Sequence, residues 1–383
     1  MQSALRIARA PLMVAPRVSA AVVGASRRSS RSGIPRIAPS ARAIAEIAAD
    51  EVMLASQVII ENPDPRKIPL RREFAQIEAA AAQLADLNPS DLHESVEPTA
   101  VQSVEVKRLR NRWELLTYRT PITLPPVLET SAPWVTAETT RVAQARVLRH
   151  EQPGPWVIVI HGARQGGDVD LSVMRARHLH ESLGLNVAMP VLPLHGPRKL
   201  DSLTIPGMDI LANVTAAVVS VAEIRALRRW IASAGGEAVG VFGVSLGGYM
   251  TALVAGVESE LDVAIAGIPV VNPHRLLARH AATLGGGEGR KIVSLLRSEP
   301  VQALERFVDP LQFQPTVPVS RRHVLGGALD RVTTPHQAVE LARHWGVDDV
   351  RWYTGGHVGH LWSSEMKAEV DKALGALNGC PDR

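Results

Sequence analysis

Cysteine is almost absent from this chain, which has 383 residues and only Cys380, near the C-terminal end. An intrachain disulfide, a zinc site built on cysteines and an iron–sulfur cluster are therefore excluded. Aromatic residues make up only 4% of the chain, so the core must be built mainly from valine, leucine, isoleucine and alanine. No stretch reaches 18 consecutive apolar residues, so the sequence predicts no transmembrane helix and leaves open only peripheral contact with a membrane.

Acidic residues are missing from residues 1–45, which contain eight arginines and many serines and alanines. This composition is typical of an organelle transit peptide, although a disordered bacterial tail, or a start site assigned too far upstream, is the simpler interpretation. Arg6, Arg9 and Arg17 interrupt the apolar region that a secretory signal peptide needs. We predict a basic, disordered and dispensable tail on a cytoplasmic protein. The alternative, if the tail is a transit peptide, is a mitochondrial protein.

The formal net charge is only +4, and beyond the first fifty positions the arginines are interspersed with acidic residues. No nucleic-acid recognition motif accompanies them, so we predict no nucleic-acid partner. The alternative is nucleic-acid binding through the basic tail alone. Nothing in the sequence indicates an oligomeric state.

Residues 46–100 are predicted to form an N-terminal helical addition, with a second helix near residues 71–87. Apolar residues near a helical period define the expected buried face of its first helix: Ile44, Ile47, Val52, Leu54 and Val58. From residue 101 the pattern changes to the alternation of polar and apolar residues that is typical of strands. Strands over residues 113–118 and 143–148 predict an antiparallel edge to a larger sheet.

Residues 156–160 form a continuous apolar run, as expected for a strand that is covered on both faces. Similar runs follow at residues 186–190, 238–242, 261–268, 323–325 and 349–353, with helical patterns between most of them. Such alternation predicts an α/β fold whose mostly parallel sheet has helices on both faces. Residues 101–383 are therefore predicted to form one catalytic domain, with a helical cap inserted at about residues 272–316.

The motif Gly243-Val-Ser245-Leu-Gly247 directly follows an apolar strand and directly precedes a helical stretch. A serine on a sharp turn between strand and helix presents its hydroxyl, and small neighbours are needed because strand and helix come very close. Ser245 is therefore the predicted nucleophile. The alternative is a glycine-rich turn with an ordinary surface serine.

A serine hydroxyl needs a base to take its proton, and the base needs a group that orients it. Asp330 follows the strand over residues 323–325 and is the predicted acid, although it could instead cap the next helix; Asp348 and Asp349 are its rivals. His357 follows the last strand and two glycines, which we expect to let the backbone bend the ring over the serine. His360 is the competing histidine, and a weaker expectation gives it contact with the substrate.

An oxyanion hole needs two backbone N–H groups, for which we predict the amides of Leu246 and Ala163. His161 is expected to brace the loop before Ala163 rather than to be catalytic, with a weaker expectation that it contacts the substrate. Arg198 and Lys199 could contact an acidic group such as a phosphate, although a solvated loop pair is the simpler interpretation. No metal ligand set is predicted.

These features resemble the alpha/beta-hydrolase superfamily over residues 101–377, because the His-Gly loop, Ser245, Asp330 and His357 occur in that superfamily's order. The segment Pro190–Lys199, the Ser-Leu-Gly-Gly sequence and the Gly-Gly-His-Val sequence are also similar to the alpha/beta-hydrolase domain-containing type-eighteen group. The loop that begins at His161 is more like that of ordinary esterases. The resemblance implies the alpha/beta-hydrolase fold, with no cofactor.

We therefore predict a serine hydrolase that cleaves a small-molecule or lipid-like carboxylic ester or thioester through an acyl-enzyme. An acyltransferase, in which an alcohol replaces water in the second step, is an alternative on the same residues. A non-catalytic binding protein with the hydrolase fold is the alternative from another functional class.

Overall fold

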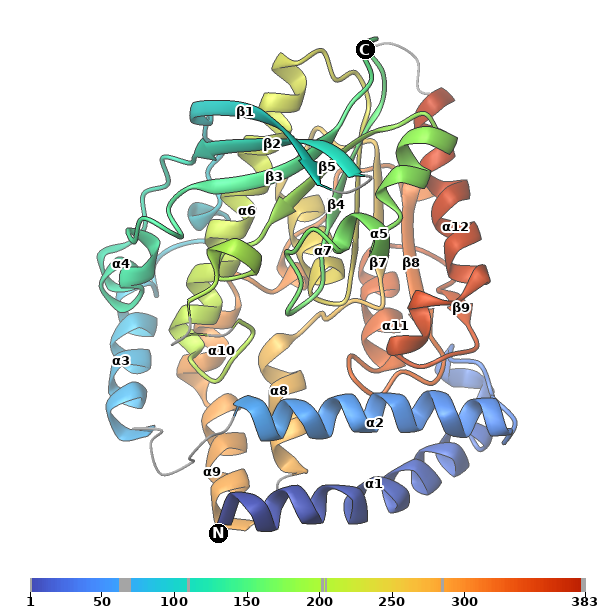
Figure 1. Cartoon of the computed structure of the whole chain (residues 1–383). Helices are drawn as coiled ribbons and strands as arrows, with labels where there is room; N and C mark the ends of the chain where they lie inside the picture. Colours follow the sequence, from blue (N-terminus) through green and yellow to red (C-terminus); the bar gives the residue numbers. More distant parts are fainter. Residues whose placement is uncertain are drawn as a thin grey trace.

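The computed structural model of the protein describes residues 2–61, 70–108, 111–200, 203, 205–283 and 286–379 (Figure 1). These residues form a nine-stranded sheet with the order β1-β2-β3-β5-β4-β6-β7-β8-β9. The strands are β1 (Thr99–Arg108), β2 (Asn111–Arg119), β3 (Ala143–Leu148), β4 (Trp156–Ile160), β5 (Asn186–Val191), β6 (Val239–Val244), β7 (Val263–Gly267), β8 (Arg322–Gly327) and β9 (Arg351–Tyr353). Pairing is antiparallel from β1 through β3 to β5 and parallel elsewhere, which confirms the predicted fold class.

Helices cover both faces of the sheet because successive strand residues point to opposite sides. One set of strand side chains, including Ile158, Val241 and Ala266, belongs to a core with the helices α6 (Ile210–Ser233), α7 (Leu246–Val257) and α11 (Pro335–His344). The alternate set, including Val157, Phe242 and Ile265, belongs to a core with α5 (Asp170–Val173) and α12 (Ser364–Gly375). The parallel strands are therefore apolar at every position, as their sequences predict.

Within the described residues, α6 alone is long and apolar enough to cross a membrane by length and composition. Its most apolar stretch is 94% buried inside the protein. Burial against the sheet therefore accounts for its hydropathy.

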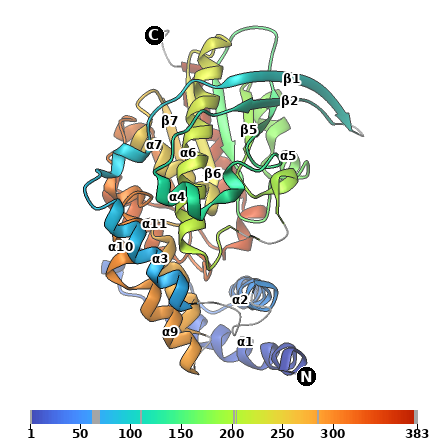
Figure 2. The same ribbon diagram turned by 90° about the vertical axis from the view of Figure 1, so that its left-hand side faces the viewer.

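Among the described residues, three α-helices lie between β7 and β8, in the segment where the sequence predicts a cap: α8 (Pro273–Ala282), α9 (Gly286–Leu296) and α10 (Glu299–Glu305). The helix α3 (Leu70–Gln83) packs against α10, and the short helix α4 (Pro126–Ser131) contacts α3 and α6. Figure 2 shows α3, α9 and α10 gathered on one side of the molecule, away from the ribbon that β1 and β2 form.

The N-terminal segment forms two long helices, α1 (Gln2–Ser26) and α2 (Ala41–Glu61), which lie side by side across one end of the molecule (Figures 1 and 2). Val18, Val22 and Ala25 are buried with Ile47 of α2 and Leu329 of the main domain. The expectation of a disordered tail is therefore wrong for residues 14–45, because apolar contacts hold this segment on the domain.

The predicted apolar face of α2 is also wrong. Ile47 is buried, but Ile44 and Val52 are 48% and 58% exposed. The side of α2 that faces the domain carries Glu46 and Asp50 instead. The Val58 side chain lies outside the part of the chain that the structure describes.

Candidate active site

Ser245 occupies a strained turn between β6 and α7. Its backbone has φ 60° and ψ −115°, a positive φ that a residue with a side chain rarely adopts. Glycines on either side allow the turn: a Cβ on Gly247 would lie 2.8 Å from the His161 carbonyl oxygen, and one on Gly243 would lie 2.9 Å from the Gly247 Cα. Both distances are shorter than real Cβ contacts, so the motif is required by the close approach of strand, helix and the loop after β4.

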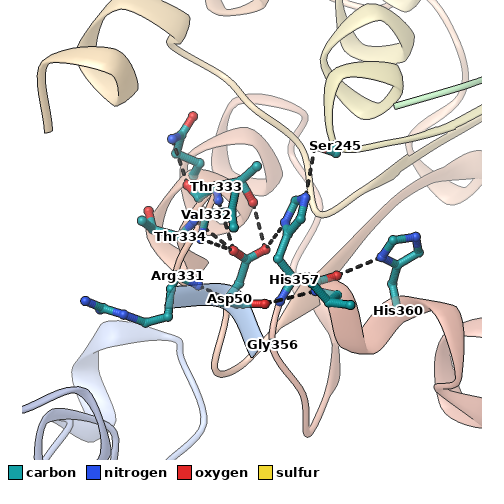
Figure 3. Close-up of polar contacts among 12 residues, drawn as sticks. Asp50, Ser245, Arg331, Val332, Thr333, Thr334, Gly356, His357 and His360 are labelled. Atoms are coloured by element: carbon teal, nitrogen blue, oxygen red, sulfur yellow. Dashed lines mark hydrogen bonds and ion pairs between the residues drawn. The ribbon is translucent and has the colours of Figure 1, made fainter. Parts of the chain in front are cut away.

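Three side chains from separate loops form one hydrogen-bonded chain (Figure 3). The Ser245 Oγ lies 3.0 Å from Nε2 of His357, and Nδ1 of His357 lies 2.8 Å from Oδ2 of Asp330. His357 and Asp330 are both buried, with 3% and 2% of their surfaces exposed. The geometry leaves Nε2 free to accept the serine proton while Nδ1–H donates to the carboxylate.

The surroundings of Asp330 keep it ionised. Burial alone would raise its pKa, but the charge of His357 and several hydrogen bonds hold the pKa below its ordinary value. Its carboxylate accepts hydrogen bonds from the amides of Val332 (2.8 Å) and Thr333 (2.9 Å) and from the Thr333 hydroxyl (2.8 Å). The same carboxylate raises the pKa of His357, although burial of the ring opposes this. The pair is therefore built to stabilise an imidazolium.

The structure brings His357, and not His360, to the serine. The His360 Nδ1–H donates to the His357 carbonyl oxygen at 2.7 Å, and burial lowers the pKa of His360 to about 4. His360 does line the cavity beside Ser245, so its predicted contact with a substrate stays a prediction. Asp348 and Asp349 are exposed before β9, so neither occupies the place of Asp330.

The two residues predicted for the oxyanion hole, Leu246 and Ala163, line the same cavity as Ser245. The Gly162 amide donates to the Gln165 side-chain oxygen at 2.5 Å, which fixes the loop that carries Ala163. The amide roles of Leu246 and Ala163 stay predictions.

His161 braces this loop, as expected, and does not line the cavity. One of its ring nitrogens lies 2.8 Å from the Gly162 carbonyl, and the other accepts the Leu192 amide at 3.1 Å. Burial lowers the pKa of His161 to about 3, so the ring is neutral. The weaker expectation that His161 contacts the substrate is wrong, because both nitrogens are used inside the protein.

Arg198 is neither a substrate ligand nor a solvated loop residue, so both expectations are wrong. It is 0% exposed and forms a two-pronged ion pair with Glu223 of α6, with N···O distances of 2.7 and 2.6 Å. It also donates to the Val191 carbonyl oxygen at 2.7 Å, which ties the end of β5 to α6. Of the Arg198-Lys199 pair, only Lys199 is exposed. Arginine suits such a site because its planar fork matches a carboxylate.

The cavity beside Ser245 has a volume of about 300 Å³. Apolar side chains from α6 and α8 form much of its wall: Val214, Ala216, Ala217, Leu276 and Leu277. Within the described residues, no group of three or more His, Cys, Asp or Glu side chains could hold a metal ion.

Sequence reasoning missed the part of the site that comes from α2. Met53 lines the cavity, and Asp50 accepts a hydrogen bond from the His357 amide at 2.7 Å. Glu46 accepts the Gly356 amide at 3.2 Å. The available signal was the pair of acidic residues Glu46 and Asp50, four positions apart on one face of a helix rich in apolar residues.

No protein-family model matches the chain. Uncharacterized protein Rv2627c and Uncharacterized protein MT2702, both of Mycobacterium tuberculosis strains, are each 36% identical over 287 residues, which cover 73% of this chain and 68% of theirs. Among solved structures, acetyl xylan esterase 1 from Thermoanaerobacterium sp. has a TM-score of 0.53 at 14% identity and covers 80% of this chain and 93% of its own. The acetyl xylan esterase from Paenibacillus sp. R4 has a TM-score of 0.50 at 17% identity, covering 83% of this chain and 98% of its own. The chain has the alpha/beta-hydrolase fold and belongs to the same family as the two mycobacterial proteins.

Proposed function

We propose that the protein is a serine hydrolase that cleaves carboxylic esters or thioesters through an acyl-enzyme on Ser245. The observation that carries this proposal is the continuous hydrogen-bonded chain from Ser245 through His357 to Asp330 at the wall of a cavity. Acetyl xylan esterases are among the solved proteins with the same fold, which supports the same class of reaction.

The proposed reaction has two steps, formation of an acyl-enzyme on Ser245 and its hydrolysis by water. In the first, the Ser245 hydroxyl gives its proton to His357 as its oxygen attacks the carbonyl carbon, and Asp330 stabilises the imidazolium. The amides of Leu246 and Ala163 hold the negative oxygen that forms. His357 then returns the proton to the leaving alcohol or thiol, and water releases the acid by the same route.

The cavity supports an apolar, lipid-like group on the substrate. Its volume of about 300 Å³ is at the lower end of the range of small-molecule sites. Two of the polar side chains in its wall are engaged with the protein's own backbone, since Tyr249 donates to the Val308 carbonyl at 2.7 Å and His280 lies 2.8 Å from the Val332 carbonyl. The proposed chemistry requires no metal or organic cofactor.

A fluorophosphonate probe, followed by mass mapping of the labelled peptide, tests the nucleophile without knowledge of the natural substrate. We expect labelling at Ser245, and Ser245→Ala should abolish labelling and reduce turnover of p-nitrophenyl esters to a residual level. Residual catalysis of about 10³–10⁴ over water is expected from the oxyanion hole and binding. Ser233→Ala is the matched control, because this exposed serine ends α6 before β6 begins and its hydroxyl donates to the Trp230 carbonyl at 2.8 Å.

Labelling at another residue would show that the nucleophile is misassigned. A folded wild-type protein that neither reacts with the probe nor hydrolyses esters would favour a binding protein. Product analysis with an added alcohol distinguishes transfer from hydrolysis.

A further inference from the structure

The helix α2 lies outside the alternating strands and helices of the domain, yet it contacts the loop that carries His357. It packs against the short helical turn η9 (Val358–Leu361), which directly follows this histidine. Asp50, in the middle of α2, is 0% exposed. A fully buried carboxylate needs partners, because an unpaired charge in the interior is very unfavourable.

The partners of Asp50 are three backbone amides on two different loops. Its Oδ2 accepts the amides of His357 (2.7 Å) and Arg331 (2.9 Å), and its Oδ1 accepts the amide of Val358 (3.0 Å). Arg331 directly follows Asp330, so one carboxylate joins the loop of the proposed base to the loop of the proposed acid (Figure 3). Hydrogen bonds to a charged acceptor are the stronger kind, so the two loops are held at a fixed separation.

The glycines around His357 provide the space for this contact. A Cβ on Gly356 would lie 2.8 Å from Oδ2 of Asp50 and 2.9 Å from the carbonyl oxygen of Glu46. A Cβ on Gly359 would overlap the Glu46 carboxylate. Neither Gly355 nor Gly356 has a positive φ, so the bend before His357 does not depend on left-handed backbone at these glycines. Gly356 and Gly359 admit the helix α2.

Stability alone does not account for a carboxylate at this place. Burial, and then the negative charge of Asp330, raise the pKa of Asp50 to about 6, against the effect of its three amide partners. Relative to a neutral group, the ionised form therefore works against folding. Residues that cost stability in this way are found preferentially at functional sites.

We propose that Asp50 is a positioning residue of the active site, which holds the backbone of the His357 loop and of the residue after Asp330 in the arrangement that hydrolysis requires. This proposal rests on the proposed serine hydrolase function. The proposal makes α2 an integral part of the active site.

The test compares Asp50→Asn with Glu51→Gln in the full-length protein. Glu51 is the adjacent buried acid on α2, but its partners are the side chains of Arg331 (3.0 Å) and Arg17 (3.8 Å) rather than the His357 loop. Asparagine presents an N–H₂ group to amides that need an acceptor, so at least one of the three hydrogen bonds is lost. Three measurements apply to each variant: kcat and KM for a short p-nitrophenyl ester, the rate of fluorophosphonate labelling, and hydrogen–deuterium exchange of the peptide over residues 351–363.

We expect Asp50→Asn to lower kcat and the labelling rate about 10- to 100-fold, because small misplacements of catalytic groups have effects of this order. KM should stay within about threefold, since Asp50 does not line the cavity. Exchange of the peptide over residues 351–363 should become faster in this variant. Glu51→Gln should leave kcat within about threefold and exchange of this peptide unchanged.

Equal effects of the two variants, or an unchanged kcat in Asp50→Asn, would overturn the proposal. Hydrogen exchange distinguishes failure of this proposal from failure of the proposed function. If the wild-type protein neither reacts with the fluorophosphonate nor hydrolyses the ester, the hydrolase proposal fails. Hydrogen exchange of the peptide over residues 351–363 would still show whether Asp50 holds the His357 loop. Unchanged exchange in Asp50→Asn would overturn the positioning role in either case. Asp50→Ala provides a second variant in case asparagine misfolds.

Discussion

Replacing Gly247 by alanine should damage both the stability and the chemistry of the protein. The added Cβ would overlap the Ile160 carbonyl oxygen and lie 2.8 Å from that of His161, where real Cβ contacts are essentially never shorter than 3.0 Å. Both obstacles are backbone atoms, so no side chain can rotate away. Either the start of α7 or the end of β4 must move by about 1 Å, and overpacking of this kind costs about 1–3 kcal/mol or more.

The same movement separates Ser245 from the loop that carries Ala163. Because a misplacement of about 1 Å can cost about 10²-fold, we expect fluorophosphonate labelling of the folded protein to slow about a hundredfold. Urea unfolding followed by circular dichroism gives the free energy of unfolding, and mass spectrometry gives the labelling rate. These two measurements on one variant separate lost folding from lost geometry.

Gly375→Ala is the matched control for Gly247→Ala. Gly375 is exposed at the end of α12, and a Cβ there would meet no atom within 4 Å. Alanine is the better helix former, so this variant should be about as stable as the wild type or more stable by about 0.5–1 kcal/mol. A free energy of unfolding within about 0.5 kcal/mol of the wild type, together with a similar labelling rate, would contradict the predicted overlap at Gly247.

Three further predictions concern the histidines and the buried ion pair. His357→Ala should lower kcat by about three decades or more while His360→Ala stays within about tenfold, and the reverse result in folded variants would make His360 the base. Because the base must be neutral and Asp330 raises the pKa of His357 above 6.5, kcat/KM should fall as pH drops through a value above 6.5; a flat profile from about pH 5 to 8 would contradict a histidine base. Glu223→Gln should lower the free energy of unfolding by about 3–5 kcal/mol, because it leaves the Arg198 charge buried and unpaired. A loss below about 1 kcal/mol in urea unfolding would show that Arg198 finds another partner.

The central sheet and the position of the serine could be predicted because their signals are local. A strand covered on both faces must be apolar at each position, and residues 156–160 and 239–242 satisfy this without reference to any distant residue. The glycines at positions 243 and 247 follow from contacts within one strand–turn–helix unit. Ser245, Asp330 and His357 each follow a parallel strand at the same edge of the sheet, so side chains from these three loops can meet. Their order along the chain is what the resemblance to the alpha/beta-hydrolase superfamily implies.

Arg198 shows what local patterns do not reveal. An Arg-Lys pair in a loop with proline and glycine is ordinarily solvated, and only the position of Glu223, 25 residues later on α6, makes burial of the arginine favourable. Charged residues are almost never fully buried unless they are paired, so the general expectation for a single arginine is exposure. The pair forms through packing of α6 beside the end of β5, which a pattern within either segment does not encode.

The helix α2 presents the same problem in a form that bears on function. Its residues Glu46 and Asp50 are four positions apart, a spacing that places them on one face, and acids on a helix face ordinarily indicate solvent. The Asp50 carboxylate instead contacts the His357 amide, 307 residues away in the sequence. Glycines at positions 356 and 359 complete the match, because only residues without a Cβ leave room for the two carboxylates. An acidic pair on a helix and a glycine-flanked histidine loop are each weak signals alone, but backbone amides that need acceptors and buried carboxylates that need donors satisfy one another. The acidic pair on α2 therefore explains the glycines of the histidine loop, and the amides of that loop explain the buried acids. Neither pattern can be interpreted until the fold brings the two segments together.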